Sequence, residues 1–422
     1  MNHAATIEAA NERVVEKIAA AQPVLVDVVR AGDVIPELEE GKVLLHAGPP
    51  ITFEEMTGPM QGSCVGAALF EGWADNEEDA RALLASEVAY IPCHHVGAVG
   101  PMGGITSRSM AVLVVEERSN GNRAFCTMNE GIGKVLRFGA YDDEVVARLH
   151  WMADDLGPAI AGALATMPDG LALMPLIARA ITMGDEFHQR NIAASALLFT
   201  KLAGPIATLD LEPARKERIL TFLADTDQFF LNVMMATCKA IMDAARTIEE
   251  GSIVTAMTRN GKNFGIRVAG LGDQWFEAPV NTPEGLFFTG FSQDDANPDI
   301  GDSAITETYG VGGMAMIAAP GVTRFVGAGG FGDALAVSNE MLEIVHGHNS
   351  GLPIPTWDFQ GACIGVDVRK VVATGITPLI NTGIAHRIAG KGQVGAGTVR
   401  APLACFEQAL EALAAKYGVE VD

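Results

Sequence analysis

The sequence has few charged residues, and basic ones are the scarcer kind. Of its 422 residues 19% are charged, with 29 Lys and Arg against 52 Asp and Glu, so the net charge is −23. This acidic balance excludes nucleic acid or an anionic membrane as the expected partner. A small anion can still bind at a local site.

Long apolar runs are also missing. Gly, Pro or a charged residue interrupts each run before the roughly 20 residues that span a bilayer. The first residues, MNHAATIEAANERVVEK, lack the apolar segment of a signal peptide. We therefore expect no membrane span and a cytoplasmic location.

The sequence contains no zinc-ribbon motif and no P-loop motif. The six cysteines, at positions 64, 93, 126, 238, 363 and 405, form no C-x-x-C pair, which excludes a zinc ribbon and favours reduced thiols. Neither G-x-G-x-x-G nor G-x-x-x-x-G-K-[ST] accompanies the Gly-rich loop CHHVGAVGPMGG, so we predict no dinucleotide-binding fold and no P-loop. No cofactor is predicted, and a divalent metal ion remains an alternative.

Apolar residues are abundant, at 49% of the chain, and the length suggests two or three domains. Residues 1–141 mix helix and strand patterns, residues 142–250 have helical spacing, and residues 251–422 return to strands. The sequence therefore predicts an α+β or α/β multidomain fold in which two α/β domains flank an all-helical domain. The apolar content also predicts a homo-oligomer.

Residues 184–191 (GDEFHQRN) place polar side chains in one of the most apolar parts of the chain. Both flanks have the apolar density of a packed helix, so we expect one buried helix over 171–202. On that helix Glu186 and Arg190 are i,i+4 neighbours. The polar stripe is either a structural Glu–Arg pair or the wall of a wet pocket, and the additional His188 and Asn191 favour the pocket.

Two further polar stretches lie far away in the sequence. After a predicted strand, CHHVGAVGPMGG offers His94 and His95 beside backbone amides of the kind that bind anions, although both rings could simply be exposed or bonded to backbone. In FSQDDANPDIGDSAITETYG we expect Asp302 or Ser303 to cap a helix that carries Glu307. The acidic residues of that stretch do not have EF-hand spacing.

The C-terminal stretch NTGIAHRIAGKGQVGAG combines His386 with repeated glycines and two basic residues. Glycines allow a close approach of the backbone to an anionic ligand. They are equally typical of a flexible surface loop, and the sequence leaves both interpretations open.

Taken together and in order, these four stretches resemble a family of domains of unknown function, the one numbered 1116, over nearly the whole chain. In some bacteria members of that family, with two partner proteins, are subunits of oxamate carbamoyltransferase. That enzyme of allantoin degradation exchanges a carbamoyl group between oxalurate and phosphate. The resemblance implies a carbamoyltransferase subunit with partner subunits, but it carries over no catalytic residue.

Phosphorolysis of oxalurate needs a phosphate cradle, a donor to the developing oxyanion, an acid for the leaving nitrogen and a clamp for the carboxylate. We expect His188 or His94 to supply the proton and Asn191 to bind the oxyanion. The anions would be held by Arg190, oriented by Glu186, and by the 390–397 glycines, Gly392 and Gly395 among them. Since the S-x-R-T-R signature of aspartate transcarbamoylase is absent, we expect a different scaffold.

Two alternatives compete with this interpretation. A metal-assisted amidohydrolase would use ligands from the set His94, His95, Asp299, Asp302 and Glu307. A non-catalytic subunit would instead complete the active site of a partner protein.

We predict that the dispersed polar clusters converge on one anion-binding pocket between the helical and α/β domains. When the clusters converge, their buried polar groups can form hydrogen bonds with one another. Each buried polar group left without a hydrogen bond would cost about 1 to 3 kcal/mol. The pocket would join the 184–191 stretch to candidate substrate-binding residues on the other segments, namely His95, Ser303, Glu307, His386, Gly392 and Gly395.

Overall fold

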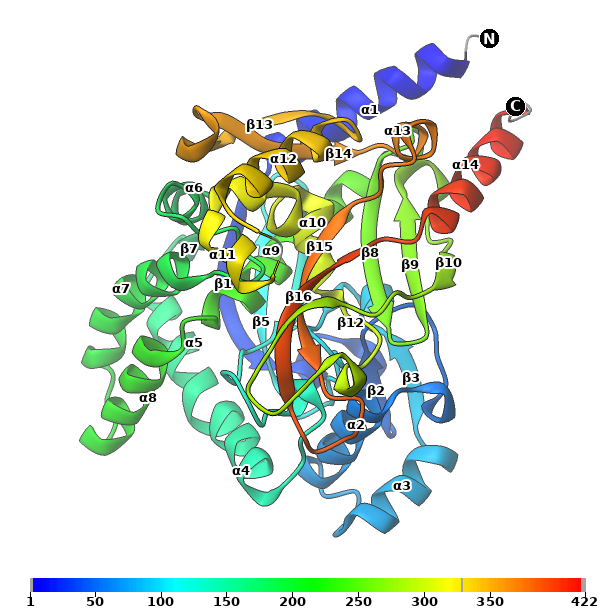
Figure 1. The fold of residues 1–422 in the computed structure, drawn as a ribbon. Helices are drawn as coiled ribbons and strands as arrows, with labels where there is room; N and C mark the ends of the chain where they lie inside the picture. The colour runs from blue at the N-terminus through cyan, green and yellow to red at the C-terminus, as the bar shows by residue number, and fades with distance from the viewer. Residues whose placement is uncertain (1–2, 328, 419–422) are drawn as a thin grey trace.

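A computed structural model describes residues 3–327 and 329–418 (Figure 1). Helices are combined with several separate sheets in an α+β multidomain fold, as the sequence predicts. Within the described part of the chain, no helix has both the length and the apolar character needed to cross a bilayer.

The first segment of the chain alternates helices with strands. Its elements are α1 (His3–Ala19), β1 (Pro23–Arg30), β2 (Val43–His46), α2 (Gly58–Phe70), α3 (Glu77–Ser86), β3 (Ala89–Pro92), β4 (Ala98–Val99), β5 (Ala111–Glu117), β6 (Asn122–Thr127) and the short 3₁₀ turn η5 (Leu136–Phe138). Strands β5 and β6 form the hairpin expected from the turn between them.

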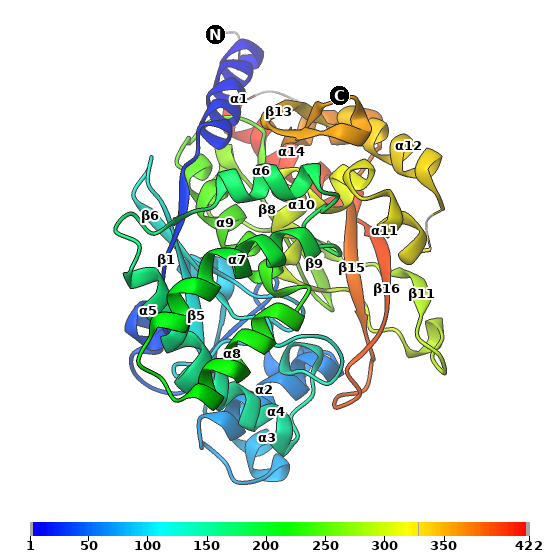
Figure 2. The same cartoon turned by 90° about the vertical axis from the view of Figure 1, so that its left-hand side faces the viewer.

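The middle of the chain is helical apart from one strand of two residues. Its elements are α4 (Asp143–Trp151), α5 (Gly157–Ala165), β7 (Leu171–Ala172), α6 (Met174–Thr182), α7 (Ile192–Thr208), α8 (Pro213–Asp225) and α9 (Phe229–Arg246). In Figure 2 helices α4, α5, α7 and α8 gather on one side of the molecule.

The last segment returns to strands and short helices. Its elements are β8 (Val254–Asn260), β9 (Asn263–Val268), β10 (Phe276–Pro279), β11 (Glu284–Phe287), β12 (Ile300–Gly301), η9 (Asp302–Ala304), α10 (Ile305–Tyr309), α11 (Pro320–Phe325), α12 (Phe331–Leu342), β13 (Val345–Ile354), β14 (Gln360–Val366), α13 (Val368–Thr374), β15 (Leu379–Ala385), β16 (Gln393–Arg400) and α14 (Leu403–Tyr417).

The three segments, which contain three main sheets, are held together by one buried helix, α9. The sheets have the strand orders β4-β6-β5-β1-β7, β10-β9-β8-β12 and β11-β16-β15. Helix α9 packs against β5 and β6 of the first sheet and against β8 and α10 of the last segment. Its sequence FFLNVMMATCKAIMDAAR is apolar on nearly all faces, as a fully buried helix requires.

The buried apolar side chains do not separate along the predicted domain boundaries. One hydrophobic core contains Leu113 of the first segment, Met234 of the helical segment and Ile305 of the last. The division into domains at 141 and 250 stays a prediction, and the shared core brings polar residues of distant segments close enough to form one site.

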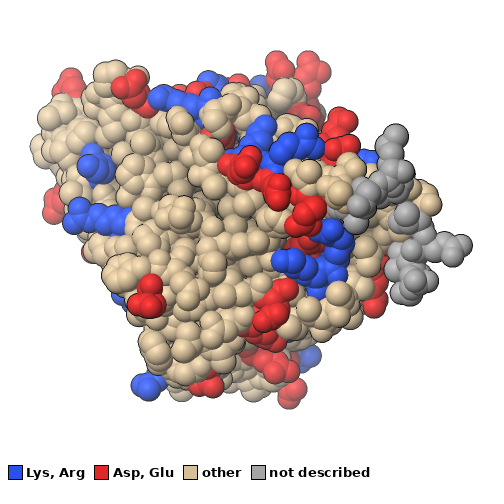
Figure 3. Space-filling view, turned by 90° about the horizontal axis from the view of Figure 1, so that it is seen from above, with Lys and Arg blue, Asp and Glu red and all other residues tan. Residues whose placement is uncertain are grey.

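On the face that Figure 3 shows, the acidic residues do not form a separate acidic patch. Figure 3, which shows the molecule from above, has Asp and Glu interspersed with Lys and Arg along one side, while a broad part of the same face carries no charged side chain. Mixed charges of this kind do not generate a strong local field of one sign.

Candidate active site

The 184–191 stretch is a loop, and the prediction of one helix over 171–202 is wrong. Helix α6 ends at Thr182 and α7 begins at Ile192. Between them Gly184 has φ +101° and Phe187 has φ +71°, backbone angles that a right-handed helix cannot contain. Phe187 is fully buried, so the surrounding packing holds this bulky residue in its unfavourable conformation.

Glu186 organises this loop through its carboxylate. Its Oε1 accepts hydrogen bonds from the backbone amides of His188 (3.2 Å), Gln189 and Arg190 (2.6 Å), and its Oε2 accepts one from Asn381 Nδ2 (3.0 Å). Glu186 therefore fixes the backbone of the loop. The predicted pairing of Glu186 with the Arg190 side chain is wrong.

The Arg190 side chain turns towards the other acidic residue of the loop. Its Nε lies 3.5 Å from Asp185 Oδ1, and the side chain is 41% exposed. Asp185 also accepts the Ala194 amide at 2.7 Å, which holds the start of α7 to the loop. Asn191 has a structural contact too, because its Nδ2 donates to the His188 carbonyl at 3.2 Å.

The buried environment changes the acidity of Glu186. Burial raises its pKa from 4.5 to about 7, although His188 opposes this effect and Glu307 adds to it. Asp185 shifts in the same direction, to about 6, again through burial. Between the ordinary and the raised pKa of Glu186 the folded protein binds more protons than the unfolded chain, so the contribution of Glu186 to stability is fully present below about pH 4.5 and is lost as the pH rises through about 7.

We expect Glu186→Gln to reduce this pH dependence. Glutamine keeps an oxygen for the three backbone amides and cannot ionise, and its amide nitrogen can donate to Asn381 Oδ1, which has no partner. Denaturant unfolding between about pH 5 and pH 8 should show a smaller loss of stability for this variant than for the unmodified chain. Equal losses in both would contradict the assignment. Glu343→Gln, at an exposed position, is the control.

His188 and Glu307 form a buried pair, as the predicted convergence requires. His188 Nδ1 lies 2.8 Å from Glu307 Oε1 and 2.9 Å from Oε2. The same carboxylate accepts the Gly313 amide at 2.8 Å and the Asn381 amide at 3.2 Å. A carboxylate at Nδ1 requires that nitrogen to carry the proton, which leaves Nε2 of the ring available to a ligand.

His188 lies at a small cavity, which we call the His188 cavity. Its volume is about 20 Å³, room for about one water molecule. The residues that line it come from seven parts of the chain and are Pro101, Met102, Arg137, Phe138, His188, Gln189, Gln228, Leu231, Ser303, Gly383 and Gln393.

The lining of the His188 cavity has a buried side and an accessible side. Arg137, His188 and Ser303 are buried, whereas the three glutamines are partly exposed. The glutamines therefore mark the side from which a ligand would enter. Met102, in the loop after β4, has φ +55°, so two of the loops that build the cavity contain a residue in the left-handed region.

The segment η9–α10 connects this cavity with a second buried polar network. Neither Asp302 nor Ser303 caps α10 as predicted, because Asp302 accepts the amides of Gly48 (3.0 Å) and Gly100 (2.9 Å) and the hydroxyl of Thr258 instead. Asp302 thus joins three distant segments. Ser303, the next residue, reaches the cavity.

His94 and His95 lie outside the cavity lining. His94 is buried with Nε2 3.6 Å from Asp302 Oδ1, and burial lowers the pKa of its ring well below the ordinary value. His95 Nε2 accepts a hydrogen bond from Trp275 Nε1 at 2.9 Å. The structure brings neither ring to His188.

The ligand set of the metal-dependent alternative is not assembled. Asp299 is bound by Arg259, with 2.6 Å between Arg259 Nε and Asp299 Oδ2, and Glu307 is bound by His188. Among the described residues no three His, Cys, Asp or Glu side chains are grouped as a metal site would need. The geometry therefore gives no support to a metal-assisted amidohydrolase.

The C-terminal glycines have structural reasons. Of the two interpretations that the sequence leaves open, the flexible surface loop does not apply to residues 393–397, which belong to strand β16. Gly395 lies in β16, where a Cβ atom would come within 2.4 Å of the Leu286 carbonyl in β11. A Cβ on Gly392 would lie 2.7 Å from the Gly133 carbonyl. His386 accepts the Ile388 amide through Nδ1 at 2.9 Å and lies near Asp295, away from the cavity lining.

Sequence reasoning missed Arg137 and the three glutamines. Arg137 is the lone charge in the apolar run VLRF, directly after the polar turn NEGIGK. Arg137 could have been recognised as a single charged residue within an apolar run, because a charged residue in such a run is buried together with its apolar neighbours. The glutamines carry no such signal.

Comparisons with known proteins give a consistent result. A family model described as oxamate carbamoyltransferase subunit AllG matches residues 88–303. A protein of Escherichia coli K12 with that same name is 65% identical over 415 residues, which cover 98% of this chain and 99% of that protein. A second protein of that strain, the uncharacterised YahG, is 43% identical and is aligned over 98% of this chain and 87% of its own length.

A solved structure has the same fold. The crystal structure of a conserved protein of unknown function from Enterococcus faecalis V583 superimposes with a TM-score of 0.95 at 44% sequence identity, covering 97% of this chain and 98% of that chain.

Proposed function

The chain belongs to the family of the oxamate carbamoyltransferase subunit AllG, and on this premise we propose that it contributes the His188 cavity to an enzyme that transfers a carbamoyl group between oxalurate and phosphate. The observation that carries the proposal is the buried His188–Glu307 pair at a cavity that also contains a buried arginine. A pair of this kind is suited to moving one proton.

In the proposed reaction the bond between the carbamoyl carbon and the amide nitrogen of oxalurate breaks. A bond forms between that carbon and a phosphate oxygen, and the proton that phosphate gives up ends on the nitrogen, which leaves in oxamate. His188 Nε2 transfers this proton while Glu307 holds the ring in the required tautomer and orientation. Ser303 is placed in the same lining to donate to the carbonyl oxygen.

The closed cavity, at about 20 Å³, is smaller than oxalurate. The proposal therefore requires the partly exposed side chains of Gln189, Gln228 and Gln393 to move when substrate binds. These side chains are long and flexible, and they lie at the accessible side of the cavity. Partner subunits, which the name of the relative implies, would close the site from that side.

The proposal includes the setting in which the chain works. We place it in the cytoplasm, in an assembly with partner subunits and more than one copy of itself, with a small anionic substrate and phosphate as ligands. The proposed chemistry uses side chains and substrate groups alone.

Activity of the assembled enzyme tests this function. The complex that contains the unmodified chain should convert oxalurate and phosphate into carbamoyl phosphate and oxamate, and His188→Asn should lower the rate about 10²-fold or more. His150→Asn, at an exposed position on α4, is the control. If the His188 variant kept full activity in an intact complex, the chain would act as a non-catalytic subunit.

A glycine next to the pair offers a test of geometry. A Cβ atom on Gly312 would lie 2.1 Å from Glu307 Oε1 and 3.1 Å from His188 Cβ, so Gly312→Ala should displace the carboxylate. We expect a loss of activity of about 10²-fold, the usual effect of a misplacement of about 1 Å.

Gly375→Ala is the matched control for the backbone. Gly312 and Gly375 have similar φ angles, +62° and +69°, but a Cβ on Gly375 would meet no atom within 4 Å. Gly375→Ala should lose about 1 kcal/mol of stability because alanine disfavours the left-handed region. Gly312→Ala should lose more, because its Cβ also displaces the buried Glu307 carboxylate. Equal activities of the two variants would show that the position of Glu307 does not matter.

A further inference from the structure

Although the charge of Glu130 acts on it, Arg137 is a buried cation that forms no salt bridge with a carboxylate of the described residues. It lies in η5 between two cavities, the His188 cavity and a second one of about 30 Å³, and lines both. The residue is 7% exposed. Burying a cation without a paired opposite charge costs free energy, so the burial of Arg137 has to be explained.

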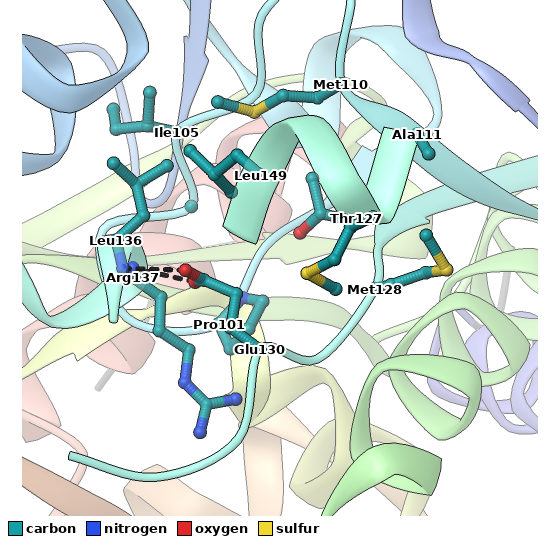
Figure 4. Close-up of a pocket in the computed structure, with 12 residues that line it drawn as sticks. Pro101, Ile105, Met110, Ala111, Thr127, Met128, Glu130, Leu136, Arg137 and Leu149 are labelled. Atoms are coloured by element: carbon teal, nitrogen blue, oxygen red, sulfur yellow. Dashed lines mark hydrogen bonds between the residues drawn. The ribbon is translucent and has the colours of Figure 1, made fainter. Parts of the chain in front are cut away.

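The nearest carboxylate is occupied by backbone groups. Glu130 accepts the amide of Leu136 at 2.8 Å and the amide of Arg137 at 3.2 Å. Figure 4 shows the Glu130 carboxylate turned towards these amides, while the Arg137 guanidinium extends away from the apolar side chains of the second cavity. Glu130 thus holds the backbone of η5 and leaves the guanidinium free.

Most of the guanidinium lacks a hydrogen-bond acceptor, although its Cζ lies 5.3 Å from the centroid of the Phe138 ring. Nη2 donates to the Gly131 carbonyl at 2.6 Å, but Nε and Nη1 are buried and have no acceptor. Burial lowers the pKa of Arg137 to about 10, which leaves the side chain charged at neutral pH. The other deeply buried arginine near the site differs, because Arg259 is paired with Asp299 and bonded to the Gly301 carbonyl.

The two cavities differ in what they offer to an anion. The second cavity is lined largely by apolar side chains, including those of Met110, Met128 and Leu149. The His188 cavity has a serine, a histidine and three glutamines that can donate hydrogen bonds. An anion bound to Arg137 would therefore find several further hydrogen-bond donors in the His188 cavity, whereas the second cavity is mostly apolar.

We propose that Arg137 binds an oxyanion of a small ligand in the His188 cavity, through the Nε and Nη1 groups that the protein leaves without acceptors. This inference rests on the proposed function. It states which substrate group Arg137 holds, namely the carboxylate that oxalurate and oxamate share or an oxygen of phosphate. Arginine suits this role because its donors stand in a fixed planar arrangement. Arg190, which the sequence favoured for the same role, is not part of the lining.

Binding to the isolated chain tests the inference without an activity assay. Titration calorimetry with oxamate and, separately, with inorganic phosphate would measure the dissociation constant for each anion. Arg137→Gln should weaken the anion that Arg137 binds by about tenfold or more, the usual effect of losing a charge-assisted hydrogen bond. Arg190→Gln should bind like the unmodified chain. The arm that responds identifies the carboxylate or the phosphate as the bound group.

A structural role for Arg137 predicts different results. Removing an unpaired buried charge should leave the melting temperature of the ligand-free chain unchanged or higher, whereas removing a structural arginine should lower it. Arg137→Lys keeps the charge but loses the planar donors, so it should fold and still bind at least about tenfold more weakly. Unchanged affinity of both variants for both anions would overturn the inference, as would the absence of binding to the unmodified chain.

The inference and the proposed function fail in separable ways. Loss of anion binding in Arg137→Gln, together with an assembled enzyme that transfers no carbamoyl group, would keep the anion site and reject the function. Full carbamoyl transfer by the Arg137→Gln complex with unchanged KM would reject the anion site and keep the function.

Discussion

Glu307→Gln is expected to lower the rate of carbamoyl transfer by a factor of about 10² to 10⁴, the contribution that general acid–base catalysis usually makes. The Glu307 carboxylate lies within 2.9 Å of His188 Nδ1 through both oxygens, and both residues are buried. Glutamine keeps the shape but removes the negative charge that stabilises a protonated imidazole. The amides of Gly313 and Asn381 still find an acceptor oxygen, so the fold should be retained.

Steady-state kinetics of the assembled enzyme measure this effect. A fall in kcat with little change in KM is the expected result, since the lost interaction matters most when the proton moves. Glu343→Gln, which changes an exposed carboxylate on the same segment of the chain, should behave like the unmodified enzyme. A Glu307→Gln complex with normal kcat would show that His188 works without this partner or does not transfer the proton.

Arg259→Met is expected to have the largest effect on stability, a loss of about 3 to 5 kcal/mol. Arg259 and Asp299 are both fully buried and joined by two hydrogen bonds of 2.6 and 3.1 Å. Arg259 also donates to the Gly301 carbonyl at 2.7 Å and to Thr382 at 3.2 Å. Its removal leaves the buried Asp299 charge without a cation, although the Thr382 hydroxyl still donates to Asp299 Oδ1 at 2.8 Å.

Urea unfolding of the isolated chain measures this loss. The exposed pair Arg13–Glu250, whose side chains are 58% and 46% exposed, provides the control, and Arg13→Met should cost less than about 1 kcal/mol. Adding Asp299→Asn to Arg259→Met should recover part of the stability because the unpaired charge is removed. A loss below about 1 kcal/mol for Arg259→Met alone would contradict the assigned role of this buried pair.

The sequence predicted that His188 and Glu307 come together, but not the conformation of the chain around His188. Apolar flanks and polar residues at helical spacing indicated a helix over 171–202, but Gly184 and Phe187 adopt left-handed angles. The spacing of polar and apolar residues cannot reveal this loop. Glu186 stabilises it by accepting hydrogen bonds from backbone amides, and such bonds leave the pattern of polar and apolar residues unchanged. The convergence of His188 with Glu307 followed from the cost of burying polar groups alone.

The glycines show why the remaining site residues could not be predicted. Glycine serves both ligand-binding loops and strands that approach closely, and the sequence does not distinguish these uses. Gly395 belongs to the second kind, because β11 passes too near for a side chain. The sequence also does not show whether adjacent histidines bind a ligand or serve the fold. His95 serves the fold, because its Nε2 accepts a hydrogen bond from Trp275.

The overall organisation was predicted in outline. A helical segment between two segments rich in strands follows from the spacing of apolar residues, and α9 lies within the stretch 142–250 that has helical spacing. Its position between β5, β6, β8 and α10 depends on packing between distant segments. Spacing within one segment carries no information about that packing.

A crystal structure of the chain with oxamate at a saturating concentration tests the central claim most directly. The account predicts oxamate in the His188 cavity, with its amide nitrogen within hydrogen-bond distance of His188 Nε2, its carboxylate at the Arg137 guanidinium, and Gln189, Gln228 and Gln393 displaced from their present positions. Oxamate bound elsewhere on the chain, with the His188 cavity closed as it is here, would contradict it.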